Sequence, residues 1–117
     1  MKREIIKTSD GSTTIHIPEW NEQYHSIHGA IQEANHVYIQ HGLNYKTTNE
    51  IAVLEIGFGT GLNSFMTFLE AQENKLFIEY VGVEAYPIFE EELLKLNYVA
   101  ELGATQFTKI LDRKSVV

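Results

Sequence analysis

The chain has 117 residues, 44% of them hydrophobic and 11% aromatic, which is enough to form the core of one small domain. It contains no cysteine, no apolar run near the roughly 20 residues that cross a bilayer and no signal-peptide pattern, so we expect a cytoplasmic protein without disulfides or a membrane helix. A formal net charge of −7 argues against broad electrostatic attraction to nucleic acid, because such proteins usually carry a basic face.

The N-terminal part predicts a hairpin followed by a helix. Two β-prone runs flank Asp10-Gly11, a pair that tolerates the backbone angles of a tight turn, and this predicts a β-hairpin over about residues 3–17. Pro18 breaks the pattern, and the stretch after it is typical of an irregular connection. Apolar side chains then recur every three or four residues and predict a helix that ends at Gly42. The apolar face of this helix consists of Ile27, Ala30, Ile31, Ala34, Val37 and Tyr38.

The second half predicts alternating strands and helices. After a polar loop, the run at 51–57 is apolar except for Glu55, as in a strand buried on both faces of a parallel sheet. Residues 62–72 have the apolar spacing of a helix, and residues 76–85 form a second strand of the same kind. Pro87 suits the first turn of a further helix, which we expect over 88–97. This order predicts an α/β fold, the opening half of a doubly wound, Rossmann-like parallel sheet.

A glycine-rich loop joins the first of these strands to its helix. Glycines at such a turn let the backbone approach a ligand closely, and the nearby helix N-terminus offers unpaired N–H groups. The dinucleotide fingerprint spaces its glycines as G-x-G-x-x-G, but Leu62 occupies the place of the last one. Glu55, Gly57, Gly59 and Gly61 instead form E-x-G-x-G-x-G, which resembles the first motif of S-adenosylmethionine-dependent methyltransferases.

A carboxylate at the end of the second strand supports this interpretation of the loop. Glu84 follows Gly61 by 23 residues, and a carboxylate at that strand tip can accept hydrogen bonds from both hydroxyls of a ribose. Without the glycine loop, Glu84 would be read as a solvated surface carboxylate, so the two features have to be taken together.

Three segments resemble one family of tRNA-modifying enzymes. The stretches 8-TSDGSTT-14, 24-YHSIHGAIQEANHVYI-39 and 55-EIGFGTGLN-63 are similar to the tRNA wobble-uridine methyltransferases that act on 5-aminomethyl-2-thiouridine. These enzymes are the methyltransferase domain of MnmC and its stand-alone relative MnmD. The resemblance runs from about residue 8 to residue 90 and is most specific at 24–39. It implies N-methylation of the 5-aminomethyl group of wobble 2-thiouridine, with S-adenosylmethionine as cofactor and tRNA as substrate.

The resemblance also implies roles for the matched positions. The cofactor floor would consist of Glu55, Gly57, Phe58, Gly59, Gly61 and Asn63. Glu84 would bind the ribose, and Tyr24, Ser26 and Gly29 would form part of a cover near the methionine end of the cofactor. Tyr24 could equally be an ordinary packing aromatic, and Glu33 is expected to be a helix cap or a buried salt-bridge partner. The catalytic residue is unknown, because the acidic residue expected from the family follows a later strand, beyond the end of this chain.

The same resemblance implies a domain longer than this chain, so we expect a portion of the enzyme. Residues 1–50 are expected to form an extension that covers the cofactor site, and residues 51–117 the first half of the domain that binds S-adenosylmethionine. Such a portion would bind cofactor weakly and would not catalyse methyl transfer alone. It would also expose parts of its sheet, which favours self-association.

Two alternatives to a tRNA methyltransferase stay open. A Rossmann-like methyltransferase of another substrate class would share the glycines and Glu84 but would not account for residues 24–39. A non-catalytic half-domain that acts in assembly would suit the short length and the acidic charge.

The remaining charged and metal-binding side chains favour no further site. The basic residues cluster near the chain ends, at Lys2, Arg3 and Lys7 and at Lys109, Arg113 and Lys114, where plain solvation is more common than a binding patch. Four histidines lie close together in the sequence, at His25, His28, His36 and His41. No paired carboxylate follows at ligand spacing, and methyl transfer requires no metal, so we expect no metal site.

Overall fold

The N-terminal residues form a small antiparallel sheet in the computed structural model, which describes residues 2–103. Strand β1 (Glu4–Lys7) pairs with β2 (Thr13–Ile17), which confirms the predicted hairpin. Its connection spans residues 8–12 rather than a two-residue turn, and only Gly11 of the Asp10-Gly11 pair has a positive φ. The connection after Pro18 was expected to be irregular, but it contains a third strand, β3 (Glu22–Gln23), paired with β2.

The hairpin connection caps the following helix. The side chains of Thr8, Ser12 and Asp10 accept hydrogen bonds from the backbone N–H groups of Ala30, Ile31 and Gln32, at 3.1, 3.1 and 2.9 Å. Burial tends to raise the pKa of Asp10, but hydrogen bonds from Ser12, Gln32 and Thr8 outweigh it and hold that pKa below its usual value. The stretch 8–14 therefore joins the hairpin to the helix.

The predicted helix over residues 27–42 is shorter and partly of another type. It begins as α1 (Ala30–Glu33) and continues as a π-helix, η1 (Ala34–Gln40). The wider turn of a π-helix shifts the side chains by about one position, so Ile39, five residues after Ala34, is buried. Ile27 and Val37, which were expected on the buried face, are exposed. A short 3₁₀ turn, η2 (Leu43–Tyr45), follows.

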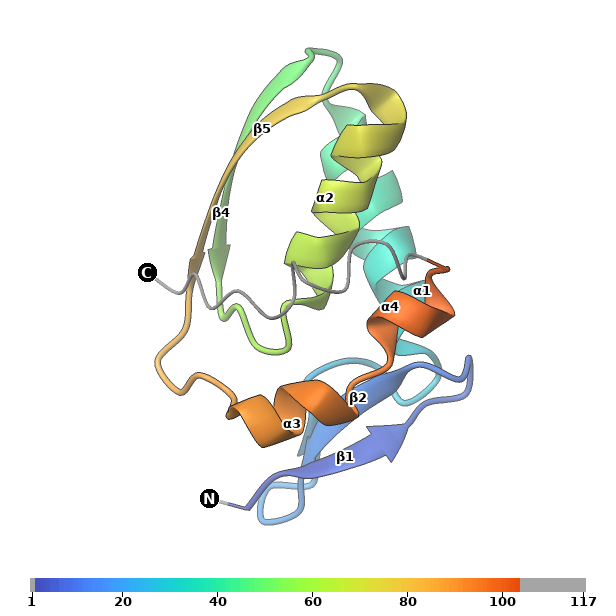
Figure 1. The fold of residues 1–117 in the computed structure, drawn as a ribbon, viewed down its shortest axis with the longest axis vertical. Helices are drawn as coiled ribbons and strands as arrows, with labels where there is room; N and C mark the ends of the chain where they lie inside the picture. Colours follow the sequence, from blue (N-terminus) through green and yellow to red (C-terminus); the bar gives the residue numbers. More distant parts are fainter. Residues whose placement is uncertain (1, 104–117) are drawn as a thin grey trace.

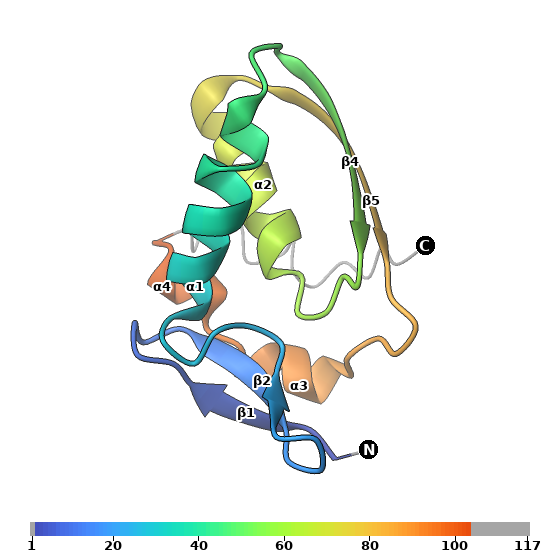
Figure 2. The same ribbon diagram turned by 180° about the vertical axis from the view of Figure 1, so that it is seen from behind.

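A parallel strand–helix–strand unit forms the rest of the described fold and confirms the predicted α/β class. Strand β4 (Glu50–Ile56) leads into α2 (Leu62–Asn74), and the chain returns through β5 (Phe77–Val83), which pairs in parallel with β4. Figures 1 and 2 show α2 and the α1–η1 helix on the same side of these two strands. The core between them consists of buried side chains that include Ala34, Ile39, Leu62, Phe65, Met66 and Tyr98.

The opposite face of β4 and β5 is uncovered in the part of the chain that the structure describes. The expectation that both strands are buried on both faces is therefore wrong for residues 2–103. Leu54 and Ile56 are 66% and 75% exposed, and Val81 and Val83 are also exposed beside them. Alternate residues point to opposite faces of a strand, so this apolar row belongs to one surface.

The last described elements are two short helices, α3 (Glu90–Lys95) and α4 (Tyr98–Glu101). Pro87 was expected in the first turn of a helix over 88–97, but α3 begins three residues later and the helix ends at Lys95. Figure 1 shows α3 lying against the hairpin. Asn97 accepts hydrogen bonds from the N–H and hydroxyl groups of Thr13, at 2.9 and 3.0 Å, and so ties this region to β2. Within residues 2–103, no helix combines the length and apolarity that crossing a membrane requires.

Candidate functional site

The glycine loop leaves β4 in a conformation that side chains rarely adopt. Gly57, Gly59 and Gly61 have φ angles of 83°, 58° and 79°, all in the left-handed region. The loop is anchored to the neighbouring strand, because the N–H groups of Gly57 and Phe58 both donate to the carbonyl oxygen of Val83, at 2.7 and 3.1 Å. The alternating glycines therefore hold a compact turn against the end of β5.

Glu84 lies directly against this loop. Its Oε1 accepts a hydrogen bond from the N–H of Gly59 at 2.7 Å, and its Oε2 accepts one from the N–H of Tyr86 at 3.1 Å. The carboxylate is thus fixed by backbone donors on either side, and each of its oxygens keeps a lone pair for a further donor.

Glu55 is held by side chains rather than by backbone. Its Oε2 accepts a hydrogen bond from the Asn63 amide at 2.9 Å, and its Oε1 accepts one from the Tyr80 hydroxyl at 2.6 Å. Burial and the neighbouring Glu55 carboxylate raise the pKa of Tyr80 well above its usual value, so this hydroxyl keeps its proton. Nearby, the Tyr38 and Thr67 hydroxyls are hydrogen-bonded at 2.6 Å. Neither Tyr80 nor Tyr38 was among the site residues predicted from the sequence.

A cleft of about 480 Å³ lies between the glycine loop and the N-terminal extension. Its walls come from β2 and the segment after it, the α1–η1 helix, β4, the glycine loop, α2 and the segment that follows β5. The sequence-predicted site residues that line it are Tyr24, Glu55, Gly57, Phe58, Gly59, Asn63 and Glu84. Tyr24 packs close to the loop, since a Cβ built on Gly59 would lie 3.2 Å from its ring. The volume is within the range of sites for small ligands.

Three sequence-predicted residues do not line the cleft. Gly61 precedes α2, and a Cβ there would lie 3.1 Å from the Phe58 ring. Ser26 caps its own turn, because its hydroxyl accepts a hydrogen bond from the N–H of His28 at 3.1 Å. Gly29 precedes α1, where a Cβ would meet the Asp10 carboxylate at 2.9 Å. The geometry thus gives these residues local structural contacts.

The charges that face the cleft are negative. Glu33, Glu55 and Glu84 line it, and no lysine or arginine occurs among the described residues of its lining. Glu33, expected as a helix cap or a buried salt-bridge partner, is exposed and accepts a hydrogen bond at 3.1 Å from the N–H of Ser26, which lies before the N-cap residue Gly29. Burial lowers the pKa of His25, which also lines the cleft, so this imidazole is neutral at pH 7. The site therefore favours a ligand that carries positive charge.

Aromatic side chains that the sequence analysis did not assign to the site complete the cleft. Trp20 and Tyr86 are 59% and 68% exposed and line it from two different segments. Aromatic faces attract cations as well as flat rings, so they suit the same kind of ligand as the carboxylates. The available signal was the presence of large aromatic side chains close to Pro18 and Pro87, in segments without periodicity.

A second, larger cleft of about 670 Å³ lies between α2 and β5, and it shares Phe58, Gly59 and Glu84 with the first. Its wall is mostly apolar and aromatic. Gly82 in β5 lies under the Phe58 ring, and a Cβ at this position would overlap the ring at Cδ2. A glycine inside a strand is a known sign of such a close approach, but Gly82 was not among the site residues predicted from the sequence.

The clustered histidines do not converge on one point. The rings of His36 and His41 meet edge to face with centroids 4.6 Å apart, whereas His25 Nδ1 lies 3.0 Å from the Thr14 hydroxyl oxygen. Among residues 2–103, no three His, Cys, Asp or Glu side chains are grouped so that they could hold a metal ion.

Comparison with known proteins gives one consistent set of relatives. No protein-family model matches the chain. It is 35% identical over 116 residues to the tRNA 5-methylaminomethyl-2-thiouridine biosynthesis bifunctional protein MnmC of Burkholderia mallei, a match that covers 92% of this chain and 17% of that protein. The MnmC proteins of Cupriavidus metallidurans and Leptospira borgpetersenii are 30% and 32% identical, over 86% and 65% of this chain and 16% and 13% of their own lengths. The chain therefore spans less than a fifth of these curated relatives.

The same group is found among solved structures. The crystal structure of MNMC2 from Aquifex aeolicus superposes with a TM-score of 0.65 at 30% sequence identity. The match covers 76% of this chain and 31% of that chain.

Proposed function

Because the chain belongs to the family of the MnmC proteins, we propose that its cleft of about 480 Å³ binds S-adenosylmethionine and that the protein is a methyltransferase acting on tRNA. The main observation behind the proposal is that the carboxylates of Glu33, Glu55 and Glu84 line a cleft beside the glycine loop. The glycines of this loop have positive φ angles. When bound, S-adenosylmethionine would supply a methyl group on a sulfonium cation, which an unprotonated amine can attack.

The charge of the cleft supports this cofactor over a dinucleotide. The ligand would bring a sulfonium, an ammonium and one carboxylate group, and Glu33, Glu55 and Glu84 attract its net positive charge. A nicotinamide dinucleotide would instead bring a negatively charged pyrophosphate, which these carboxylates repel. No cation among the described lining residues would offset that repulsion.

Individual residues fit the parts of the cofactor. Glu84 would accept hydrogen bonds from the ribose hydroxyls with the lone pairs that Gly59 and Tyr86 leave unused. Gly57 would let the cofactor lie close to the backbone, since a Cβ there would meet no atom within 4 Å. Glu55, held by Asn63 and Tyr80, would present a fixed negative charge to the methionine end.

Residues 1–50 are proposed to cover the cofactor, as the contact of Tyr24 with the glycine loop supports. The finer activity that we propose is N-methylation of the 5-aminomethyl group of wobble 2-thiouridine, supported by the names of the relatives, which place them in the biosynthesis of 5-methylaminomethyl-2-thiouridine in tRNA. A tRNA substrate is consistent with a cytoplasmic protein.

Calorimetry tests the cofactor directly. We expect heat of binding when S-adenosylhomocysteine is titrated into the protein and none with a nicotinamide dinucleotide.

Glu84→Ala should weaken S-adenosylhomocysteine binding by about 1.5 to 3 kcal/mol, because charge-assisted hydrogen bonds are lost. Glu79→Ala is the matched control, since it removes the same charge from an exposed position of β5, the strand that precedes Glu84. Binding of the dinucleotide alone would contradict the assignment, and equal affinities of the two variants would remove Glu84 from the site.

Nucleoside analysis tests the substrate. In cells that lack the gene and have no second enzyme of this type, tRNA should accumulate 5-aminomethyl-2-thiouridine, and restoring the gene should convert it to the methylated form. The amine has to be close to the sulfonium and unprotonated for this reaction. Wobble nucleosides that do not change after deletion would rule out this substrate and leave a methyltransferase of another substrate class.

The uncovered face of β4 and β5 supports a second candidate, a half-domain that acts in assembly. Leu54, Ile56, Val81 and Val83 form an apolar surface that self-association would bury. This role requires no small ligand. A folded protein that self-associates but gives no heat with S-adenosylhomocysteine would favour it over the enzyme.

A further inference from the structure

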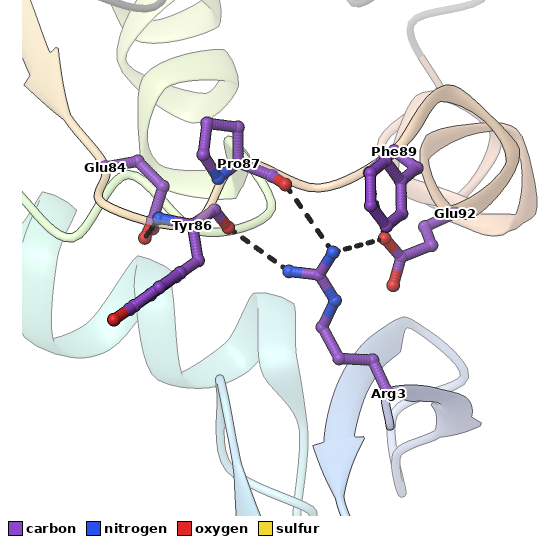
Figure 3. Close-up of polar contacts among 6 residues, drawn as sticks. All are labelled: Arg3, Glu84, Tyr86, Pro87, Phe89 and Glu92. Atoms are coloured by element: carbon purple, nitrogen blue, oxygen red, sulfur yellow. Dashed lines mark hydrogen bonds and ion pairs between the residues drawn. The ribbon is translucent and has the colours of Figure 1, made fainter. Parts of the chain in front are cut away.

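Arg3, directly before β1, reaches the segment that follows β5. The guanidinium group of Arg3 donates to the carbonyl oxygen of Tyr86 at 3.2 Å and, more weakly, to that of Pro87 at 3.5 Å. It also forms an ion pair with the Glu92 carboxylate at 2.7 Å and lies 5.3 Å from the centre of the Phe89 ring. Figure 3 shows the guanidinium group at the centre of these contacts.

This ion pair differs from an ordinary surface contact. The side chains of Arg3 and Glu92 are only 8% and 17% exposed, and the same Glu92 oxygen also accepts a hydrogen bond from the N–H of Phe89 at 2.8 Å. Burial lowers the pKa of Arg3, but interactions with Tyr24 and Glu92 more than compensate, so the group stays charged. Arg3 thus contacts the 86–92 segment at several points, and Tyr86 of this segment lines the cleft.

The segment held by Arg3 carries part of the cleft. Residues 84–89 form neither helix nor strand, so no ladder of backbone hydrogen bonds fixes them. Glu84 and Tyr86 nevertheless line the cleft, at the start of this segment. Their positions depend on contacts from outside the segment, and those from Arg3 come from a residue more than 80 positions away in the sequence.

We propose that Arg3 is a positioning residue for the cleft: it fixes residues 84–89 so that Glu84 and Tyr86 face the bound ligand. The proposal rests on the proposed function, because the ligand is the cofactor assigned there. Arginine suits the role better than lysine. Its planar group can contact two carbonyl oxygens, a carboxylate and an aromatic face together, whereas an ammonium group is a point charge with fewer directions.

The test compares Arg3→Ala, Arg3→Lys and Lys2→Ala in the full chain. Lys2 is the matched control, because it is the neighbouring cation and its ion pair with Glu4, at 3.5 Å, is largely exposed. Amide hydrogen exchange over residues 84–89 reports the order of the segment without any ligand. The fluorescence of Trp20, the single tryptophan, reports binding of S-adenosylhomocysteine, since Trp20 lines the cleft.

Arg3→Ala should speed exchange over residues 84–89 by about tenfold and raise the Kd for S-adenosylhomocysteine by about tenfold, whereas Lys2→Ala should change neither. Arg3→Lys should recover part of both losses. A purely structural role would lower the melting temperature of Arg3→Ala but leave its Kd unchanged well below that temperature, which would overturn the proposal. Unchanged exchange in Arg3→Ala would also overturn it. Absence of binding by the wild type would instead contradict the proposed function, and exchange alone would then decide whether Arg3 orders the segment.

Discussion

Replacing Tyr98 with alanine is expected to lower the free energy of unfolding by about 3 to 5 kcal/mol, the range for removing a large buried aromatic side chain. Tyr98 is 1% exposed and belongs to the core formed by α2 and the α1–η1 helix. Its hydroxyl donates to Thr60 in the glycine loop at 3.2 Å, and its ring meets His25 edge to face. Since a domain of this size is stable by only about 5 to 15 kcal/mol, the variant should lose a large part of its stability.

Urea titrations of three variants check this expectation. Tyr45→Ala is the control, because Tyr45 is 83% exposed and its loss should cost less than about 0.5 kcal/mol. Tyr98→Phe removes only the hydroxyl and should cost about 1 kcal/mol through the lost bond to Thr60. Burial raises the pKa of Tyr98 to about 12, so the hydroxyl of the folded protein is protonated at neutral pH. Equal stabilities of Tyr98→Ala and Tyr45→Ala would contradict the packing of α4 against the core.

The burial of Tyr98 also shows which parts of the fold could be predicted from the sequence. The β4–α2–β5 unit has local signals, namely an apolar run, helical spacing over residues 62–72 and glycines between them, and these predicted its type and order. Helix α4 has only four residues, too few for a periodic pattern, so its one core side chain could not be identified. Its burial depends on contacts with Thr60 and His25, which are distant in the sequence.

The presence of a helix after the hairpin could be predicted, but not which of its side chains are buried. Apolar spacing assumes 3.6 residues per turn, whereas η1 widens to a π-helix, so Ile39 rather than Val37 is buried. Likewise, a continuous apolar run cannot distinguish a strand covered on two faces from one covered on a single face. Leu54 and Ile56 have the same character as buried strand residues, and only the arrangement of the helices shows that they are exposed.

In the candidate site, too, local sequence signals could be predicted and contacts between distant residues could not. The spacing of the glycines and Glu84 predicted residues that the fold brings into direct contact, since the N–H of Gly59 donates to Glu84. The partners that hold them could not be predicted in this way. Arg3 and Tyr80 act across long separations in sequence, and their residue types alone are common on any surface.

Gly82→Val is expected to lower the free energy of unfolding by about 3 kcal/mol and to weaken S-adenosylhomocysteine binding at least about tenfold. Replacing glycine within a strand by a β-branched residue normally stabilises the strand, because glycine loses the most chain entropy on folding. Here the sign is reversed, since any Cβ at Gly82 would overlap the Phe58 ring. Phe58 lines both clefts, so its displacement should disturb ligand binding as well as packing.

A double variant separates this overlap from a general cost of changing β5. In a Phe58→Ala background the ring is absent, so Gly82→Val should become neutral or stabilising, which corresponds to a coupling energy of about 3 kcal/mol between the two positions. The measurement is a urea titration of the wild type, both single variants and the double variant. If Gly82→Val costs the same in both backgrounds, the two positions are independent and Phe58 does not lie over β5. A cost that disappears with the ring means that Gly82 is required because it leaves room for Phe58 beside the glycine loop.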